Sequence, residues 1–154
     1  MKFFRKYRHW VLVPVFTLII LWIAPGVSQW MLVMCAGKGN LIGVRILLSF
    51  GVDPNAKIMD PGDAIITAAQ RGRTAVVSLL LEKGADPNAV PEGAESALMY
   101  AAGHDHPGTL KALLAGGADP NYDDGVGGTP MMFAEGYPDE IRILKQAGAK
   151  PSRK

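Results

Sequence analysis

The residues of this sequence that most resemble a metal site are His104, Asp105 and His106, which stand in a row. Histidine and aspartate are zinc ligands, but zinc in proteins needs three or four converging ligands. Neither a third histidine nor a cysteine stands near this cluster in the sequence. We therefore interpret it as a turn, with His106 at the start of a helix that Pro107 opens, and predict no metal.

Two further features invite a comparison with catalytic sites. Cys35 is the only thiol, and residues 125–128 read Gly-Val-Gly-Gly. The glycines lack the spacing of a phosphate-binding loop and follow no buried strand, so they predict the tip of a hairpin loop. Neither a serine elbow, a zincin motif nor a defined carboxylate pair occurs. We therefore predict a protein that is not an enzyme, without cofactor or small-molecule substrate. Catalysis by Cys35, or by His104 with His106, is the hypothesis with the least support.

The charges are distributed unevenly along the chain. The 154 residues carry a net charge of +2, yet four basic residues lie within the first eight and the first acidic residue is Asp53. Without those four, 12 basic residues stand against 14 acidic ones, for a net charge of −2. A surface that follows nucleic-acid phosphates is therefore not expected. The length allows one modest core, and a single cysteine excludes an internal disulfide.

An uncharged apolar segment follows the basic residues. Trp10 to Ala24 contains no charged side chain, and as a helix it would span about 22 Å, against roughly 30 Å for the bilayer core. Two interpretations of residues 10–27 stay open: an uncleaved transmembrane anchor, which is our first hypothesis, or a signal peptide. Tryptophans at 10, 22 and 30 favour the anchor, because tryptophan prefers membrane interfaces. Small residues at 24–28 would suit cleavage.

The basic residues also predict the topology. Positive charge before an apolar segment keeps residues 1–9 in the cytoplasm and places residues 28–154 outside. The expected localisation is the inner membrane with a periplasmic domain. The alternative is a periplasmic or secreted protein.

A repeat runs through the remainder of the chain. The string GVDPN begins at Gly51, GADPN begins at Gly84 and Gly117, and a degenerate GAKPS begins at Gly148. The first three are evenly spaced, and the fourth arrives two positions early. Four apolar or small positions recur in the same register, two in each expected helix. These series are Leu32, Ile65, Leu98, Met131; Cys35, Ala68, Ala101, Ala134; Val44, Val77, Leu110, Ile141; and Leu47, Leu80, Leu113, Leu144.

Each copy predicts a short helix, a turn, a second helix that ends at glycine, and an extended loop. This unit resembles the ankyrin repeat, most closely at residues 68–72 (AAQRG) and 78–88 (SLLLEKGADPN), while Thr129-Pro130 keeps the usual opening of the first helix. The resemblance implies an all-α ankyrin-repeat solenoid of about four helix-turn-helix repeats with short hairpin loops. One N-terminal hydrophobic helix would precede it. The expected repeats are approximately 28–57, 58–90, 91–123 and 124–154.

Two departures from the family pattern affect the expected packing. The histidine that usually follows Thr-Pro-Leu is replaced by Val33, Ile66, Met99 and Met132, so we expect no polar network between repeats and greater dependence on apolar contacts. The fourth copy is two residues short, and we place the deletion in the turn at Gly136-Tyr137.

The two ends of the expected array differ in polarity. Lys145 and Glu135 replace a leucine and a small residue of the other copies, as in a solvent-facing cap. Residues 30–36 of the first copy are apolar throughout. We therefore expect the anchor, the bilayer surface or a partner to cover the first repeat.

Repeats of this family usually bind proteins along the concave face, which the loop tips and first helices form. The resemblance therefore implies an unidentified protein partner, with the membrane contacted through the N-terminal helix. The site residues that it implies are Lys38, Lys57, Met59, Arg71, Glu92, Glu95, His104, Tyr122, Asp123 and Asp124.

Overall fold

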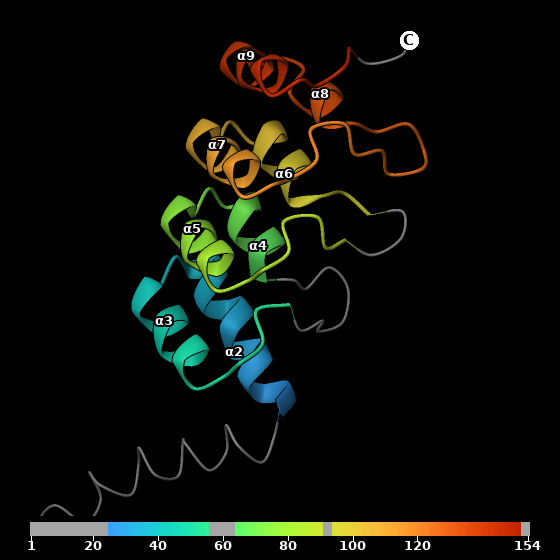
Figure 1. Ribbon diagram of the computed structural model, residues 1–154. Helices are drawn as coiled ribbons and strands as arrows, with labels where there is room; N and C mark the ends of the chain where they lie inside the picture. Colours follow the sequence, from blue (N-terminus) through green and yellow to red (C-terminus); the bar gives the residue numbers. More distant parts are fainter. Residues whose placement is uncertain (1–24, 56–63, 91–93, 152–154) are drawn as a thin grey trace, which may run out of the picture.

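The structure, a computed structural model, describes residues 25–55, 64–90 and 94–151. This part of the chain is a stack of helix pairs (Figure 1). Its helices are α2 (Pro25–Lys38), α3 (Leu41–Ser49), α4 (Ala64–Gln70), α5 (Thr74–Glu82), α6 (Ala97–Gly103), α7 (Pro107–Ala115), α8 (Pro130–Phe133) and α9 (Pro138–Gln146). The described residues contain no strand, so the all-α prediction is confirmed for them, and the described parts of the loops have no strand ladder of a hairpin.

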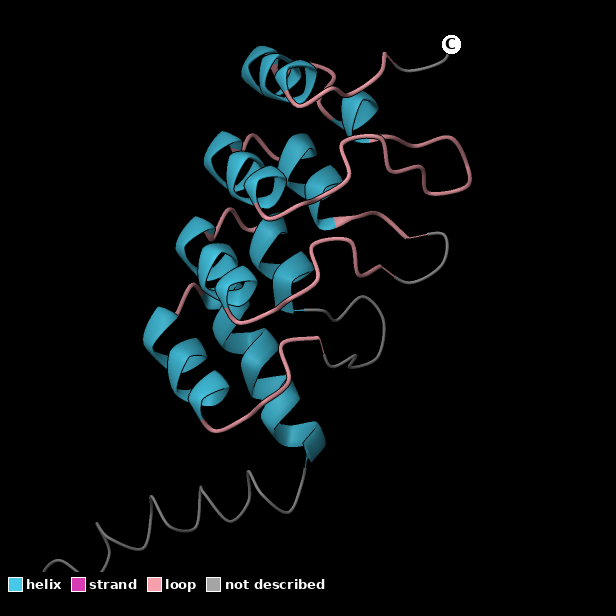
Figure 2. Cartoon of the chain, viewed as in Figure 1, coloured by secondary structure: helices cyan, strands magenta, loops and turns pink. Residues whose placement is uncertain are grey.

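The helices form two parallel rows. The first helices of the pairs, α2, α4, α6 and α8, pack on one another in order, and the second helices, α3, α5, α7 and α9, do the same beside them. The described parts of the loops that join successive pairs lie on the side of the first helices (Figure 2). We call the edge of the stack that these loops form the loop edge. We call the edge formed by the short turns between the two helices of each pair the turn edge.

The repeating apolar positions make the core, as predicted. Leu80, Leu113 and Leu144 of the second helices are 0 % exposed. So are Ala68, Ala101 and Ala134 of the first helices, where small side chains allow close approach. Cys35 and Ile141 are less buried than the other members of the four series. Both are half-buried and pack against the core from its margin.

The expectation that no polar network joins the repeats is wrong. Asn88 Nδ2 donates to the carbonyl oxygen of Gly117 at 3.0 Å, and its Oδ1 accepts from Asp119 N at 2.8 Å. Equivalent pairs of bonds link Asn55 to Gly84 (2.9 Å) and Asp86 (2.7 Å), and Asn121 to Gly148 (3.2 Å) and Lys150 (2.8 Å). Because both ends of each amide are used, each of these three loops is tied to the next repeat. We call this series the asparagine ladder.

The aspartate of each Asp-Pro-Asn motif orients the ladder. Asp86 Oδ1 accepts from the backbone N of Asn88 at 2.9 Å, and Asp53 and Asp119 make the same bond two residues ahead. This local bond fixes the turn that the asparagine occupies. The recurring motif is therefore a structural device for joining repeats.

The deletion in the fourth copy lies between its two helices, as the sequence predicts. From Ala134, which matches Ala101, four positions lead to Pro138, against six from Ala101 to Pro107. The backbone N of Tyr137 donates to the carbonyl oxygen of Ala134 at 2.9 Å, where that of His106 donates to Ala101 at 3.2 Å, so the turn at Gly136-Tyr137 is shorter by two residues. Helix α8 also has four residues where α6 has seven. Pro130 sets the start of α8 at the usual register, and the helix ends early.

Helix α2 is longer than the other first helices. It has 14 residues, while α4 and α6 have seven each. The extra length lies at its N-terminal end, before the position that matches the start of α4. Most of the predicted segment 10–27 and all of residues 1–9 lie outside the described residues. Within the described ranges, no helix combines the length and apolar character needed to cross a bilayer.

Candidate functional site

The turn edge carries three of the predicted site residues. Lys38, Arg71 and His104 occupy equivalent positions in the first three pairs, and all three are exposed. Arg73 is also exposed, and its Nε donates to the carbonyl oxygen of Gly37 at 3.3 Å. The turn edge is therefore basic in its first two repeats, which Arg73 also bridges, while Asp105 and Glu135 are exposed on its last two.

The two histidines of the predicted turn make contacts within the stack. His106 is the N-cap of α7, as predicted, and its Nε2 lies 3.2 Å from the carbonyl oxygen of Gln70 in the previous repeat. Its ring covers Gly72, whose φ of 63° and lack of a side chain allow that approach. Nδ1 of His104 lies 2.9 Å from the carbonyl oxygen of Tyr100. Across the described residues, no group of three or more histidine, cysteine, aspartate or glutamate side chains forms a site for a metal ion.

Glu140, next to this turn, is a buried carboxylate. Its side chain is 1 % exposed and Oε1 has no hydrogen-bond partner. Burial raises the pKa of Glu140 above its usual 4.5. A hydrogen bond from its own backbone N–H lowers the pKa in part, whereas the negative charges of Asp105 and Asp139 raise it further. Glu140 occupies the position that Thr109 and Val76 hold in the preceding repeats, both of them buried. A buried, ionised carboxylate at this position opposes folding.

We expect Glu140→Gln to raise the thermal unfolding midpoint at neutral pH. Because the folded pKa is raised, the folded protein binds a proton more tightly than the unfolded chain, and stability falls as pH rises from 4.5 through the folded pKa. The amide has no charge to bury at any pH. The advantage of the variant should therefore shrink towards zero below pH 4.5. Calorimetry at several pH values checks this, with exposed Glu135→Gln as the control; a pH-independent difference would contradict the linkage.

The last loop uses two of its three predicted site residues internally. Tyr122 is half-buried and its hydroxyl donates to the carbonyl oxygen of Ala94 at 3.1 Å, which joins this loop to the preceding one. Asp124 is 9 % exposed, and its Oδ1 accepts from the backbone N of Val126 (2.9 Å) and of Gly128 (2.8 Å). Asp123 alone of the three is exposed, with Oδ1 bonded to Gly125 N at 2.8 Å. The loop is thus preorganised to present Asp123.

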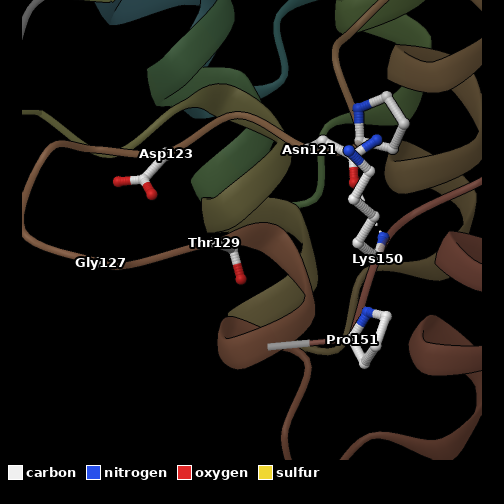
Figure 3. Close-up of a pocket in the computed structure, with 7 residues that line it drawn as sticks. Asn121, Asp123, Gly127, Thr129, Lys150 and Pro151 are labelled. Carbon is white, nitrogen blue, oxygen red and sulfur yellow. Dashed lines mark hydrogen bonds between the residues drawn. The ribbon is translucent and has the colours of Figure 1, made fainter. Parts of the chain in front are cut away.

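A hollow of about 370 Å³ lies between this loop and the C-terminal residues (Figure 3). Asp123 and Gly127 line it on the loop side, and Asn121, Lys150 and Pro151 line it on the other. The hydroxyl of Thr129, which also lines it, is buried and has no hydrogen-bond partner. A carboxylate and an ammonium group therefore flank one shallow hollow at the end of the loop edge.

The loop edge carries a series of exposed aspartates. Asp53, Asp86 and Asp119 recur once in each of the first three repeats and, with Asp123, are exposed, while Lys150 holds this position in the fourth. Glu95 is half-buried just before α6, and the predicted residues Lys57, Met59 and Glu92 lie outside the described residues. Opposite charges therefore lie at the two edges of the first two repeats, and nothing in the arrangement of these described residues aligns a nucleophile with a base.

The comparisons with known proteins agree with the repeat architecture. The search of curated proteins found no match. Residues 65–114 match the family model for ankyrin repeats (many copies). This segment runs from α4 to α7 and contains the second and third helix pairs. The match supports a likeness to the ankyrin repeat family over these residues.

Proposed function

We propose that this chain is a non-enzymatic, membrane-anchored ankyrin-repeat protein that binds another protein on the extracytoplasmic side. Ankyrin repeats indicate protein–protein interaction, and their family is typically non-enzymatic. The observation that carries the proposal is the row of exposed aspartates on loops held in register by the asparagine ladder. A rigid row of like charges favours a partner of complementary shape and opposite charge.

Site-specific photo-crosslinking in the native cell tests this surface. A benzophenone amino acid at Asp123 or His104 should crosslink to one discrete protein. The matched control is Ser78, an exposed residue of α5 in the row of second helices. Asp123→Lys should weaken the crosslink formed from His104, because it reverses a charge on the loop edge. Equal crosslinking from all three positions would contradict a defined binding surface.

The anchor is supported by the start of α2. This helix begins at Pro25, and Ser28 in its first turn is 5 % exposed. Cleavage before Val27 or Gln29 would remove the beginning of a helix that packs on α4. An uncleaved segment leaves α2 intact, which favours the anchor, and the basic residues within 1–9 would then keep that end in the cytoplasm.

The alternative is a signal peptide that is removed, which leaves a periplasmic or secreted ankyrin protein. Such a protein would act as an inhibitor, an immunity protein or a protective partner of an enzyme. It would use the same loop edge, so the two hypotheses differ only in the N-terminal segment.

Intact mass spectrometry of membrane and soluble fractions separates the two hypotheses. The anchor predicts the whole chain of 16.5 kDa in the membrane fraction, extracted by detergent and retained in alkaline carbonate. A soluble chain that begins near Val27 or Gln29 would contradict the anchor and establish the alternative. A variant with Leu18→Arg and Leu21→Arg, in the centre of the apolar segment, should leave the membrane fraction under the anchor hypothesis.

A further inference from the structure

The N-terminal end of the stack exposes large apolar side chains on two helices. On α2, Trp30 is 57 % exposed, and Met31 and Met34 are each 38 % exposed. On α3 and its C-cap, Ile42, Ile46 and Phe50 are 74, 48 and 59 % exposed. Residues 30, 31 and 34, like 42, 46 and 50, follow helical spacing, so each helix carries one stripe. We call these six residues the N-terminal end face.

The repeat register establishes that this face points away from the stack. Gly116 occupies the position of Phe50 two repeats later, and a Cβ built on it would lie 2.7 Å from Cδ1 of Leu81 in the preceding repeat. Gly108, at the position of Ile42, faces Thr74 of the preceding repeat. In that later repeat, a side chain at either position would therefore meet the preceding repeat, although both glycines are exposed. In the first repeat, the residues at these positions are large and have no preceding helix pair among the described residues.

Burial at two further positions agrees with this interpretation. Leu79, at the position of Ile46, is 6 % exposed, and Ala64, at the position of Met31, is 2 % exposed. Both residues are buried in the second repeat, which has the first repeat before it. The opposite end of the stack differs, because Glu135 and Lys145 are exposed there and suit water. Of the two described ends, the N-terminal one is therefore built as a surface to be covered.

Charge and chain connection identify the occupant. The whole chain before Asp53 has no acidic residue, while Lys38 and Arg45 are exposed on α2 and α3. Arg45 stands between Ile42 and Ile46 in the sequence of α3. Apolar residues with tryptophan and flanking cations are the composition of a helix that lies at an anionic membrane interface. The uncharged segment 10–24 also joins α2 directly at Pro25.

We propose that the N-terminal end face docks on the headgroup region of an anionic lipid bilayer, so that the first repeat rests on the membrane. This inference depends on the proposed function, because a segment anchored in the bilayer holds the face within reach of it. Tethering makes even a weak interfacial affinity sufficient. Docking would order the stack relative to the membrane, with the capped C-terminal end farthest away.

Fluorescence labelling of the full chain in vesicles tests the proposal. The background is Cys35→Ala, since alanine occupies the equivalent position in the three later copies. Ile42→Cys and, separately, Ile46→Cys would carry the dye NBD, and Gln146→Cys at the other end of the stack is the matched control. The vesicles contain phosphatidylcholine, alone or mixed equally with phosphatidylglycerol, together with a headgroup nitroxide lipid.

The expected result is loss of NBD emission to the nitroxide lipid at residues 42 and 46 and no loss at 146. The loss should be larger with phosphatidylglycerol and should fall when Arg45 is replaced by glutamine. Protein that floats with the vesicles but is quenched equally at 42 and 146 would overturn docking and leave the anchor intact. Emission at 42 that is protected from aqueous iodide but insensitive to the lipid nitroxide would overturn it in favour of a second copy or the chain's own segment. Protein that does not float would overturn the anchor and, with it, the docking.

Discussion

The Leu80→Ala variant is expected to lose about 2–5 kcal/mol of the free energy of unfolding. Leu80 lies in α5 and is 0 % exposed. It belongs to the series that fills the core side of each second helix, so truncation leaves a cavity that neighbouring rigid helices close only in part. A urea titration of the chain in mild detergent, followed by circular dichroism at the helix band, measures the change.

The control for this variant is Ser78→Ala, an exposed substitution two residues earlier on the same helix. It should change the free energy of unfolding by less than about 0.5 kcal/mol. Equal effects of the two substitutions would mean that α5 does not pack through the predicted apolar stripe. A loss at Leu80 of less than about 1 kcal/mol would likewise contradict the burial of this series.

The second large effect is expected for Asn88→Ala, with a loss of about 2 kcal/mol, since two hydrogen bonds to the next repeat contribute roughly 1 kcal/mol each. The variant leaves the carbonyl oxygen of Gly117 and the N–H of Asp119 without these partners. Asn88→Asp separates the two bonds, because it keeps the acceptor for Asp119 N but removes the donor to Gly117. It also brings a negative charge beside that carbonyl oxygen. We therefore expect it to be no more stable than the alanine variant at neutral pH.

Equivalent positions provide the internal check on the ladder. Asn55→Ala and Asn121→Ala should each lose a similar free energy of unfolding, because the bonds repeat. Gln146→Ala, an exposed amide side chain of α9, is the control and should be near neutral. If the asparagine variants match this control, the ladder bonds contribute no net stability. The same urea titration measures all five variants.

The sequence predicted the core well because one period governs both helices of every repeat. Leu80 and Ala101, for example, have counterparts at the same register in the neighbouring copies and helical spacing to their neighbours, which determines their face. The asparagine ladder was missed for a different reason. The recurrence of Asn88 is visible in the sequence, but its partners lie in the next repeat and depend on how closely two loops approach.

The candidate site was predicted less completely than the core. Exposure of Lys38, Arg71 and Asp123 followed from their positions in turns and loops. The internal use of Tyr122 and Asp124 depends on a neighbouring loop and on backbone N–H groups that the residue types do not specify. Lys150 lines the hollow because the C-terminal residues lie beside the last loop. Protein binding through these residues stays a prediction.

The asparagine ladder makes the number of repeats adjustable. Each bond is formed with the following unit, so a duplicate of one whole repeat inserted between two existing copies would remake the same two bonds at both new junctions. Neither end would need redesign, since the apolar first unit and the charged last unit keep their neighbours. Insertion or loss of whole copies would therefore change one property, the distance between the first helix pair and the exposed carboxylate of Asp123.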